Sequence, residues 1–97
     1  MVRVVDRLGD TARVALCRAV QGPSVTELGE VLADLRARGC LLVEVDLTGV
    51  TLLSREAVWV LFDDAQRHEE PGGLRLHGAS GQAEYILGET GLARVLS

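Results

Sequence analysis

The segment Asp46–Phe62 constrains the fold more than any other part of the chain, because it joins a strand to an amphipathic helix through a short turn that carries a serine. Upstream, residues 40–47 are rich in β-branched and large apolar side chains, which predicts a strand packed on both faces inside a sheet. Downstream, four apolar residues recur at the spacing of one helix face: Val58, Leu61, Phe62 and Ala65. The first N–H groups of a helix lack partners within the helix, so a serine can cap them or an anion can bind there. We therefore expect chemistry or recognition at this junction.

The chain has 97 residues, the size of a single domain (1–97), since domains commonly hold about 100 to 150 residues around one core. Its 47% hydrophobic and 25% charged residues, with a net charge of -4, indicate a folded soluble protein. The ten basic residues are all arginine and are outnumbered by fourteen acids, so nucleic acid is not an expected partner. No apolar run approaches the roughly 18 residues of a membrane span, so we expect no membrane insertion and a cytoplasmic protein. Cys17 and Cys40 lie in apolar runs and are expected to be buried and reduced.

Turn and capping signals divide the chain into strand-like and helix-like segments. Two short β-like runs flank Gly9-Asp10, which predicts an opening hairpin. Ser24 and Glu27 have the spacing of a capping box, which predicts that Ser24 starts the first helix, and Gly39 is expected to end it. Strands are predicted at 2–5, 12–17, 40–47 and 74–78, helices at 24–39, 54–68 and 80–91, and a closing strand or tail at 92–96.

The predicted order of elements is therefore β-β-α-β-α-β-α-(β). Strands that alternate with single helices give parallel neighbours joined by right-handed crossovers, and the opening hairpin adds an antiparallel pair. This order predicts an α/β domain with a mixed central sheet.

The block Asp46-Leu-Thr-Gly-Val-Thr-Leu-Leu, with the serine-bearing turn and helix after it, resembles the STAS domains and especially the bacterial anti-sigma factor antagonists. Gly72-Gly-Leu-Arg-Leu-His-Gly78 is similar to the family's G-x-L-x-L strand, and Leu87-Gly-Glu-Thr-Gly-Leu92 is similar to its L-x-x-T-G-L helix end. The resemblance spans nearly the whole chain. It implies a STAS-like domain that acts as a protein-interaction module, whose partner is an anti-sigma factor of the ATP-binding kinase type.

The chain departs from the family at the turn before the recognition helix, where the family reads D-S-S/A-G. Aligned on Asp46, Ser54 stands at the family's Asp, Arg55 at its phosphoacceptor serine and Glu56 at the next small residue. Gln21 stands where the family has the Asp of an earlier G-E-L-D turn. The resemblance therefore implies an antagonist that regulates transcription without the usual serine phosphoswitch.

Five residues form the predicted partner-binding surface: Ser54, Arg55, Glu56 and Trp59, with Gln21 close by. Ser54 is expected to be an N-cap that accepts from an N–H two or three residues on. Ser54 is also the candidate phosphoacceptor, because a phosphate there would meet the positive end of the helix. Trp59 is predicted at the edge of the buried face, either packed under a loop or in an interface, where tryptophan is enriched.

The remaining polar residues indicate no catalytic or metal centre. His68 is expected to interact with the C-terminus of its helix and His77 to lie at the surface, and neither has a second ligand at metal spacing. The pairs Asp63-Asp64 and Glu69-Glu70 are expected to be solvated. No phosphate-binding loop and no nucleophile–base spacing occurs, so we expect neither a cofactor nor an enzyme.

Two other classes of function stay open at the level of sequence. The domain could be an accessory or scaffold subunit of a larger assembly, such as a transporter regulator or a stress-signalling complex, and it would then copurify with a stoichiometric partner. It could instead be a small-molecule or nucleotide sensor, which calorimetry against nucleotides would detect.

Overall fold

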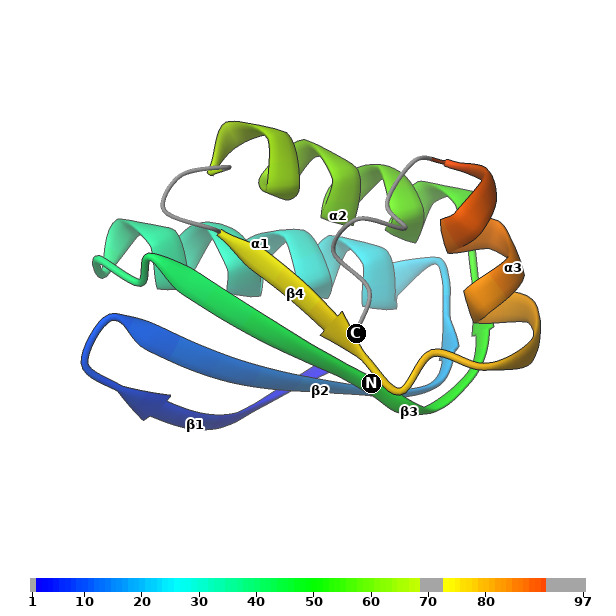
Figure 1. The fold of residues 1–97 in the computed structure, drawn as a ribbon, viewed down its shortest axis with the longest axis horizontal. Coiled ribbons are helices and arrows are strands. Elements are labelled where there is room, and N and C mark those ends of the chain that lie inside the picture. The colour runs from blue at the N-terminus through cyan, green and yellow to red at the C-terminus, as the bar shows by residue number, and fades with distance from the viewer. Residues whose placement is uncertain (1, 69–72, 91–97) are drawn as a thin grey trace.

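The structure is a computed structural model that describes residues 2–68 and 73–90. The strands are β1 (Val2–Leu8), β2 (Thr11–Val20), β3 (Leu42–Leu53) and β4 (Leu74–His77), and the helices are α1 (Pro23–Ala37), α2 (Arg55–Arg67) and α3 (Gly81–Glu89) (Figure 1). This sequence of elements confirms the predicted order over the described residues. The predicted closing strand at 92–96 lies outside them.

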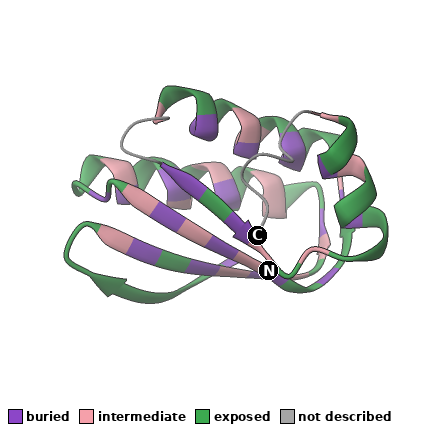
Figure 2. Ribbon diagram, in the orientation of Figure 1, coloured by how far each residue is buried: buried purple, intermediate pink, exposed green. Residues whose placement is uncertain are grey.

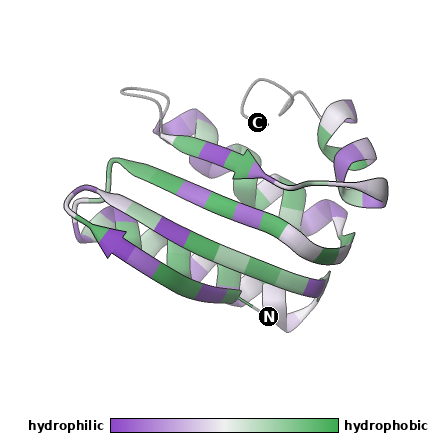
Figure 3. Ribbon diagram, turned by 60° about the horizontal axis from the view of Figure 1, so that its bottom comes forward, coloured by the Kyte–Doolittle hydropathy of each residue, from purple (hydrophilic) through white to green (hydrophobic). Residues whose placement is uncertain are grey.

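The four strands form one mixed sheet in the order β1-β2-β3-β4. β1 and β2 pair antiparallel across a turn at Gly9, whose φ of 63° is the left-handed conformation that glycine adopts freely. β2 pairs parallel with β3, and β3 pairs parallel with β4. Helices α1 and α2 lie over one face of the sheet and α3 lies at its end (Figure 1), whereas Figure 3 shows the opposite, open face. The predicted hairpin and the predicted α/β fold with a mixed sheet are confirmed.

Buried and half-buried residues alternate along the first half of β3 (Figure 2). The buried residues are Val43, Val45 and Leu47, and the half-buried residues between them are Glu44 and Asp46. The prediction of a strand at 40–47 packed on both faces is therefore wrong in its bounds and in its environment. Because β2, β3 and β4 follow one another in a single direction across the sheet, right-handed crossovers place both α1 and α2 on the same face.

The start of α1 differs from the predicted capping box. The N-cap is Gly22, with a φ of 56°, and Pro23 occupies the first helical position, where its missing N–H costs no hydrogen bond. Ser24 is already inside the helix, and the Glu27 carboxylate accepts a hydrogen bond from the backbone N–H of Val2 at 3.2 Å. The predicted capping box is wrong because Gly22 and Pro23 start the helix one residue before Ser24. Glu27 instead holds the start of β1 against α1.

The prediction that the Asp63-Asp64 pair is solvated is wrong for Asp64. Asp64 is 7% exposed and pairs with Arg36 of α1, whereas Asp63 is exposed and pairs with Arg67 one turn along the same helix. Consecutive helix positions differ by about 100° around the axis, so two adjacent acids face different surroundings. His68 is the C-cap of α2, at the predicted helix end, and its Nε2 lies 4.0 Å from Oδ1 of Asp64.

Neither cysteine belongs to a disulfide in the described part of the chain. Cys40 is buried, which confirms its prediction, but Cys17 is only half-buried. Cys17 differs because it is out of phase with the residues of β2 that enter the core, which are Ala12, Val14, Leu16 and Val20.

Candidate functional site

The junction between β3 and α2 is a tight corner at Ser54. The backbone N–H of Ser54 donates to the carbonyl oxygen of Val20 at 3.0 Å, which extends the pairing of β3 with β2 by one residue. Its backbone is extended, and its Oγ accepts from the N–H of Ala57 at 3.2 Å. The predicted N-cap role of Ser54 is therefore confirmed.

Gln82 of α3 fixes the other side of the same corner. Its side-chain Oε1 accepts from the N–H of Leu53 at 2.8 Å, and its Nε2 donates to the carbonyl oxygen of Leu53 at 3.0 Å. Pairing of β4 with β3 ends at the pair His77–Asp46, so β4 leaves Leu53 without a strand neighbour on that side. The amide of Gln82 makes the two hydrogen bonds that such a neighbour would make. Sequence reasoning missed Gln82, because a lone amide at a helix start carries no periodic signal.

The corner exposes two charged side chains that have no partner among the described residues. Arg55 and Glu56 are both exposed, and neither side chain forms a hydrogen bond or an ion pair within residues 2–68 and 73–90. Glu56 is favourable in the first turn of a helix, whereas a cation such as Arg55 is mildly unfavourable there. Gln21 is exposed and directly follows Val20, the residue bonded to Ser54, so it lies at this corner as the resemblance implied.

Trp59 lies one turn further along α2 from Arg55 and is 64% exposed. Its ring meets that of Phe62 edge to face, with centroids 5.9 Å apart and an interplanar angle of 85°. Burial of Trp59 under a loop, one of its two predicted environments, is wrong. The indole therefore presents most of its surface beside the corner.

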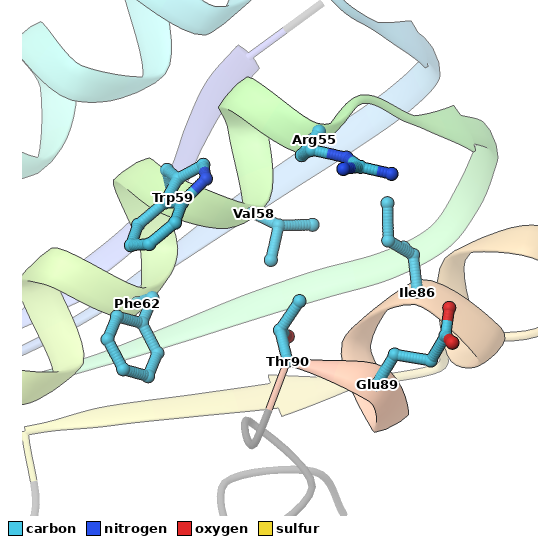
Figure 4. A pocket seen from close by; sticks show the side chains of 7 residues that line it. All are labelled: Arg55, Val58, Trp59, Phe62, Ile86, Glu89 and Thr90. Atoms are coloured by element: carbon cyan, nitrogen blue, oxygen red, sulfur yellow. The ribbon is translucent and has the colours of Figure 1, made fainter.

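A groove of about 400 Å³ runs between α2 and α3 (Figure 4). It is lined from α2 by Arg55, Val58, Trp59 and Phe62, and from the end of α3 by Ile86, Glu89 and Thr90. Figure 4 shows Val58 at its centre, between the aromatic rings of α2 and the side chains of α3. Helical spacing alone assigned Phe62 to the core, but Phe62 is only half-buried: it packs against the core and also lines the groove. The groove depends on how α3 lies against α2, which periodicity within one helix does not reveal.

The open face of the sheet carries a second polar group of residues, which lines a shallow hollow of about 290 Å³: Arg13, Glu44, Asp46, Thr48 and His77. Hydrogen bonds from the Thr48 hydroxyl and then from its N–H, at 2.6 and 2.9 Å, lower the pKa of Asp46 below its ordinary value. His77 lies at the surface, as predicted, although its side chain is half-buried. Its Nε2 lies 2.9 Å from Oε2 of Glu44, so it contacts an acid. Within the described residues, no group of three or more acidic, histidine or cysteine side chains is placed to hold a metal ion.

The helices in the described part of the chain are all too short or too polar to cross a lipid bilayer. No protein-family model matches the sequence, and no curated protein matches it either.

The fold matches solved structures of anti-sigma factor antagonists. One match is SpoIIAA of Bacillus in its unphosphorylated form, with a TM-score of 0.84 and 13% identity over 100% of this chain and 84% of that chain. Another is an anti-sigma factor antagonist from Mycobacterium paratuberculosis, with a TM-score of 0.81 and 15% identity over 99% of this chain and 83% of that chain. The murine anion transporter Slc26a9 also matches, with a TM-score of 0.67 and 13% identity over 92% of this chain and 15% of the transporter.

These matches confirm the predicted STAS-like fold of the anti-sigma factor antagonists. At sequence identities of 13% to 15%, these likenesses establish the fold and not the function, because proteins of one fold can have many different functions.

Proposed function

We propose that this domain, which has the fold of the anti-sigma factor antagonists, is a non-catalytic protein-interaction module that binds an anti-sigma factor and so regulates transcription. The observation that carries the proposal is the exposed corner between β3 and α2, where Arg55 and Glu56 have no partner within the described residues. Two charged side chains that form no ion pair in the described part of the chain, beside an exposed tryptophan, fit a contact surface for another protein.

The proposed contact surface consists of Ser54, Arg55, Glu56, Trp59 and Gln21. The pairing of Ser54 with Val20 supports this grouping, since it brings Gln21 to the start of α2. Trp59 extends the surface by one turn of α2. Arg55, which takes the place of a switch serine, would meet an acidic group of the partner.

The proposed partner is an anti-sigma factor of the ATP-binding kinase type in the cytoplasm, which the resemblance implies. Binding would be independent of phosphorylation, because the position of the family's acceptor serine is occupied by Arg55. The hydroxyl of Ser54 serves as the helix cap, and this contact supports a structural role for the nearest serine.

The test is a pulldown from the native cell lysate with the wild type and Arg55→Ser, each with and without ATP. The wild type is expected to capture an anti-sigma factor under both conditions and to raise sigma release in transcription assays. Arg55→Ser restores an acceptor hydroxyl, so its capture should fall when ATP is present. Failure of the wild type to capture any anti-sigma factor contradicts the proposal.

Phosphorylation of Ser54 is the alternative form of regulation. In that case ATP weakens capture by the wild type, and mass spectrometry of the peptide that contains Ser54 finds a phosphate. A phosphate at the N-cap would interact favourably with the positive end of α2. An unmodified peptide, with the kinase shown to be active, excludes this form.

A second candidate function is that of an accessory subunit in a larger assembly. The likeness to part of Slc26a9, an anion transporter, favours it. Such a subunit would copurify with a stoichiometric partner and leave sigma release unchanged, which separates it from the first proposal.

A further inference from the structure

The groove between α2 and α3 has an apolar floor and two charged residues on its lining. Val58 is buried at the floor, Ile86 is half-buried, and Trp59 stands exposed on the wall formed by α2 (Figure 4). The volume of about 400 Å³ is enough for one or two large side chains. An apolar side chain seated there would remove the Trp59 ring from water.

The two charged residues of the groove do not neutralise each other. Arg55 comes from the first turn of α2 and Glu89 from the last turn of α3, and no ion pair within residues 2–68 and 73–90 joins them or satisfies either one. The indole N–H of Trp59 likewise donates to none of the described residues. A ligand can therefore find a cation, an anion and a donor around one apolar floor.

We propose that this groove seats an amphipathic segment of the protein partner, with a large apolar side chain on Val58 and Trp59, an acidic group at Arg55 and a basic group at Glu89. The inference rests on the proposed function, because it assigns a second part of the same partner to the surface that continues from the corner at Ser54. The charge arrangement fixes the direction in which the segment lies. Specificity then comes from α3 as well as from α2.

The test uses a matched pair of variants on α3. Glu84 and Glu89 are both exposed acids on this helix, but only Glu89 lines the groove. The anti-sigma factor captured by the wild type is purified and titrated into the wild type, Glu89→Arg and Glu84→Arg. Trp59 is the only tryptophan of the chain. Its fluorescence emission therefore reports directly on the groove when the partner has no tryptophan, or when the partner's tryptophans have been replaced by phenylalanine.

The expected result has two parts. Glu89→Arg weakens binding on the order of tenfold or more, whereas Glu84→Arg binds like the wild type. The emission of Trp59 moves to shorter wavelength when the partner binds the wild type. Circular dichroism should show the same helix content in all three proteins, since both substituted positions are exposed.

Three outcomes overturn the inference. In the first, the partner binds the wild type and Arg55→Ala weakens this binding, but Glu89→Arg and Glu84→Arg bind like the wild type and the Trp59 emission does not move. The partner then does not occupy the groove, while the proposed function stands. If Trp59 emission shifts with the concentration of the domain alone, and Glu89→Arg abolishes the shift, the occupant is a second copy of this chain. If no anti-sigma factor binds the wild type, the proposed function fails and the inference fails with it.

Discussion

Arg36 of α1 and Asp64 of α2 form a buried bidentate ion pair, with Nη2–Oδ2 and Nε–Oδ1 distances of 2.7 and 3.2 Å. The same guanidinium donates to the carbonyl oxygens of Cys40, Leu41 and Gly73 at 3.1, 2.8 and 2.7 Å. One side chain therefore joins the two helices to the segments that lead into β3 and β4. This network holds α2, and with it the proposed contact surface, in place over the sheet.

Removal of the buried carboxylate should be costly. Asp64→Ala leaves Arg36 buried without a counter-charge, so the free energy of unfolding should fall by about 3 to 5 kcal/mol. Asp63→Ala is the matched control, because Asp63 directly precedes Asp64 on the same helix but is exposed. Its ion pair with Arg67 contributes about 1 kcal/mol or less to the free energy of unfolding. Urea unfolding followed by circular dichroism measures both. Equal losses in the two variants would show that the buried pair has no special role.

Loss of the Ser54 cap should destabilise α2 moderately. Ser54→Ala removes the acceptor for the N–H of Ala57, and the free energy of unfolding should fall by about 1 kcal/mol. Ser54→Asp keeps an acceptor at the N-cap and should stay close to the wild type. Thermal unfolding of the three proteins tests this, and a Ser54→Asp protein as unstable as Ser54→Ala would contradict the capping role.

Gln82→Ala should loosen the end of β3. It leaves the N–H and carbonyl of Leu53 without their side-chain partner, which should cost about 1 to 3 kcal/mol. Hydrogen exchange of the Leu53 amide should become faster, because this amide loses its acceptor. Gln66→Ala, at an exposed position of α2, is the control and should change neither quantity. Unchanged exchange at Leu53 in Gln82→Ala would refute the role of the amide.

Thr48→Val should raise the pKa of Asp46 toward its ordinary value of 3.8, because the Thr48 hydroxyl is the largest cause of the lowered pKa. A carboxyl whose pKa is lower in the folded state adds stability above its unfolded pKa and loses that stability as the pH falls through the folded pKa. The stability difference between wild type and variant should therefore be largest at neutral pH and shrink below about pH 3.8. NMR titration of the Asp46 carboxyl checks the shift. Identical titrations in both proteins would contradict the assigned cause.

Much of the fold could be predicted because local signals and tertiary packing agree. The glycines at 9 and 39 both adopt positive φ at the ends of elements, and Ser54 caps its helix as its position before an apolar stripe indicated. The boundary of α1 could not be predicted correctly, since two capping signals overlap there and the sequence does not rank them. Gly22 and Pro23 determine the start, which frees Glu27 for Val2.

The candidate site was less accessible from the sequence, because its contacts join segments far apart in the chain. Gln82 and Leu53, which fix the corner, are 29 residues apart, and Arg36 and Asp64, which hold α2 in place, are 28 residues apart. One signal for Asp64 did exist: it lies three residues after Leu61, on the apolar side of α2. The groove beside Trp59 depends on the position of α3, which no pattern within α2 contains.

The central claim is that the exposed side of α2 binds a protein partner, and calorimetric titration of the anti-sigma factor into Trp59→Ala tests it most directly. Tyr85→Ala is the matched control, since Tyr85 is 69% exposed and Trp59 is 64% exposed, but Tyr85 does not line the groove. The account predicts that Trp59→Ala loses about 2 kcal/mol or more of binding free energy with a nearly unchanged Tm, while Tyr85→Ala binds like the wild type. Full affinity of Trp59→Ala together with a large drop in Tm would contradict the account.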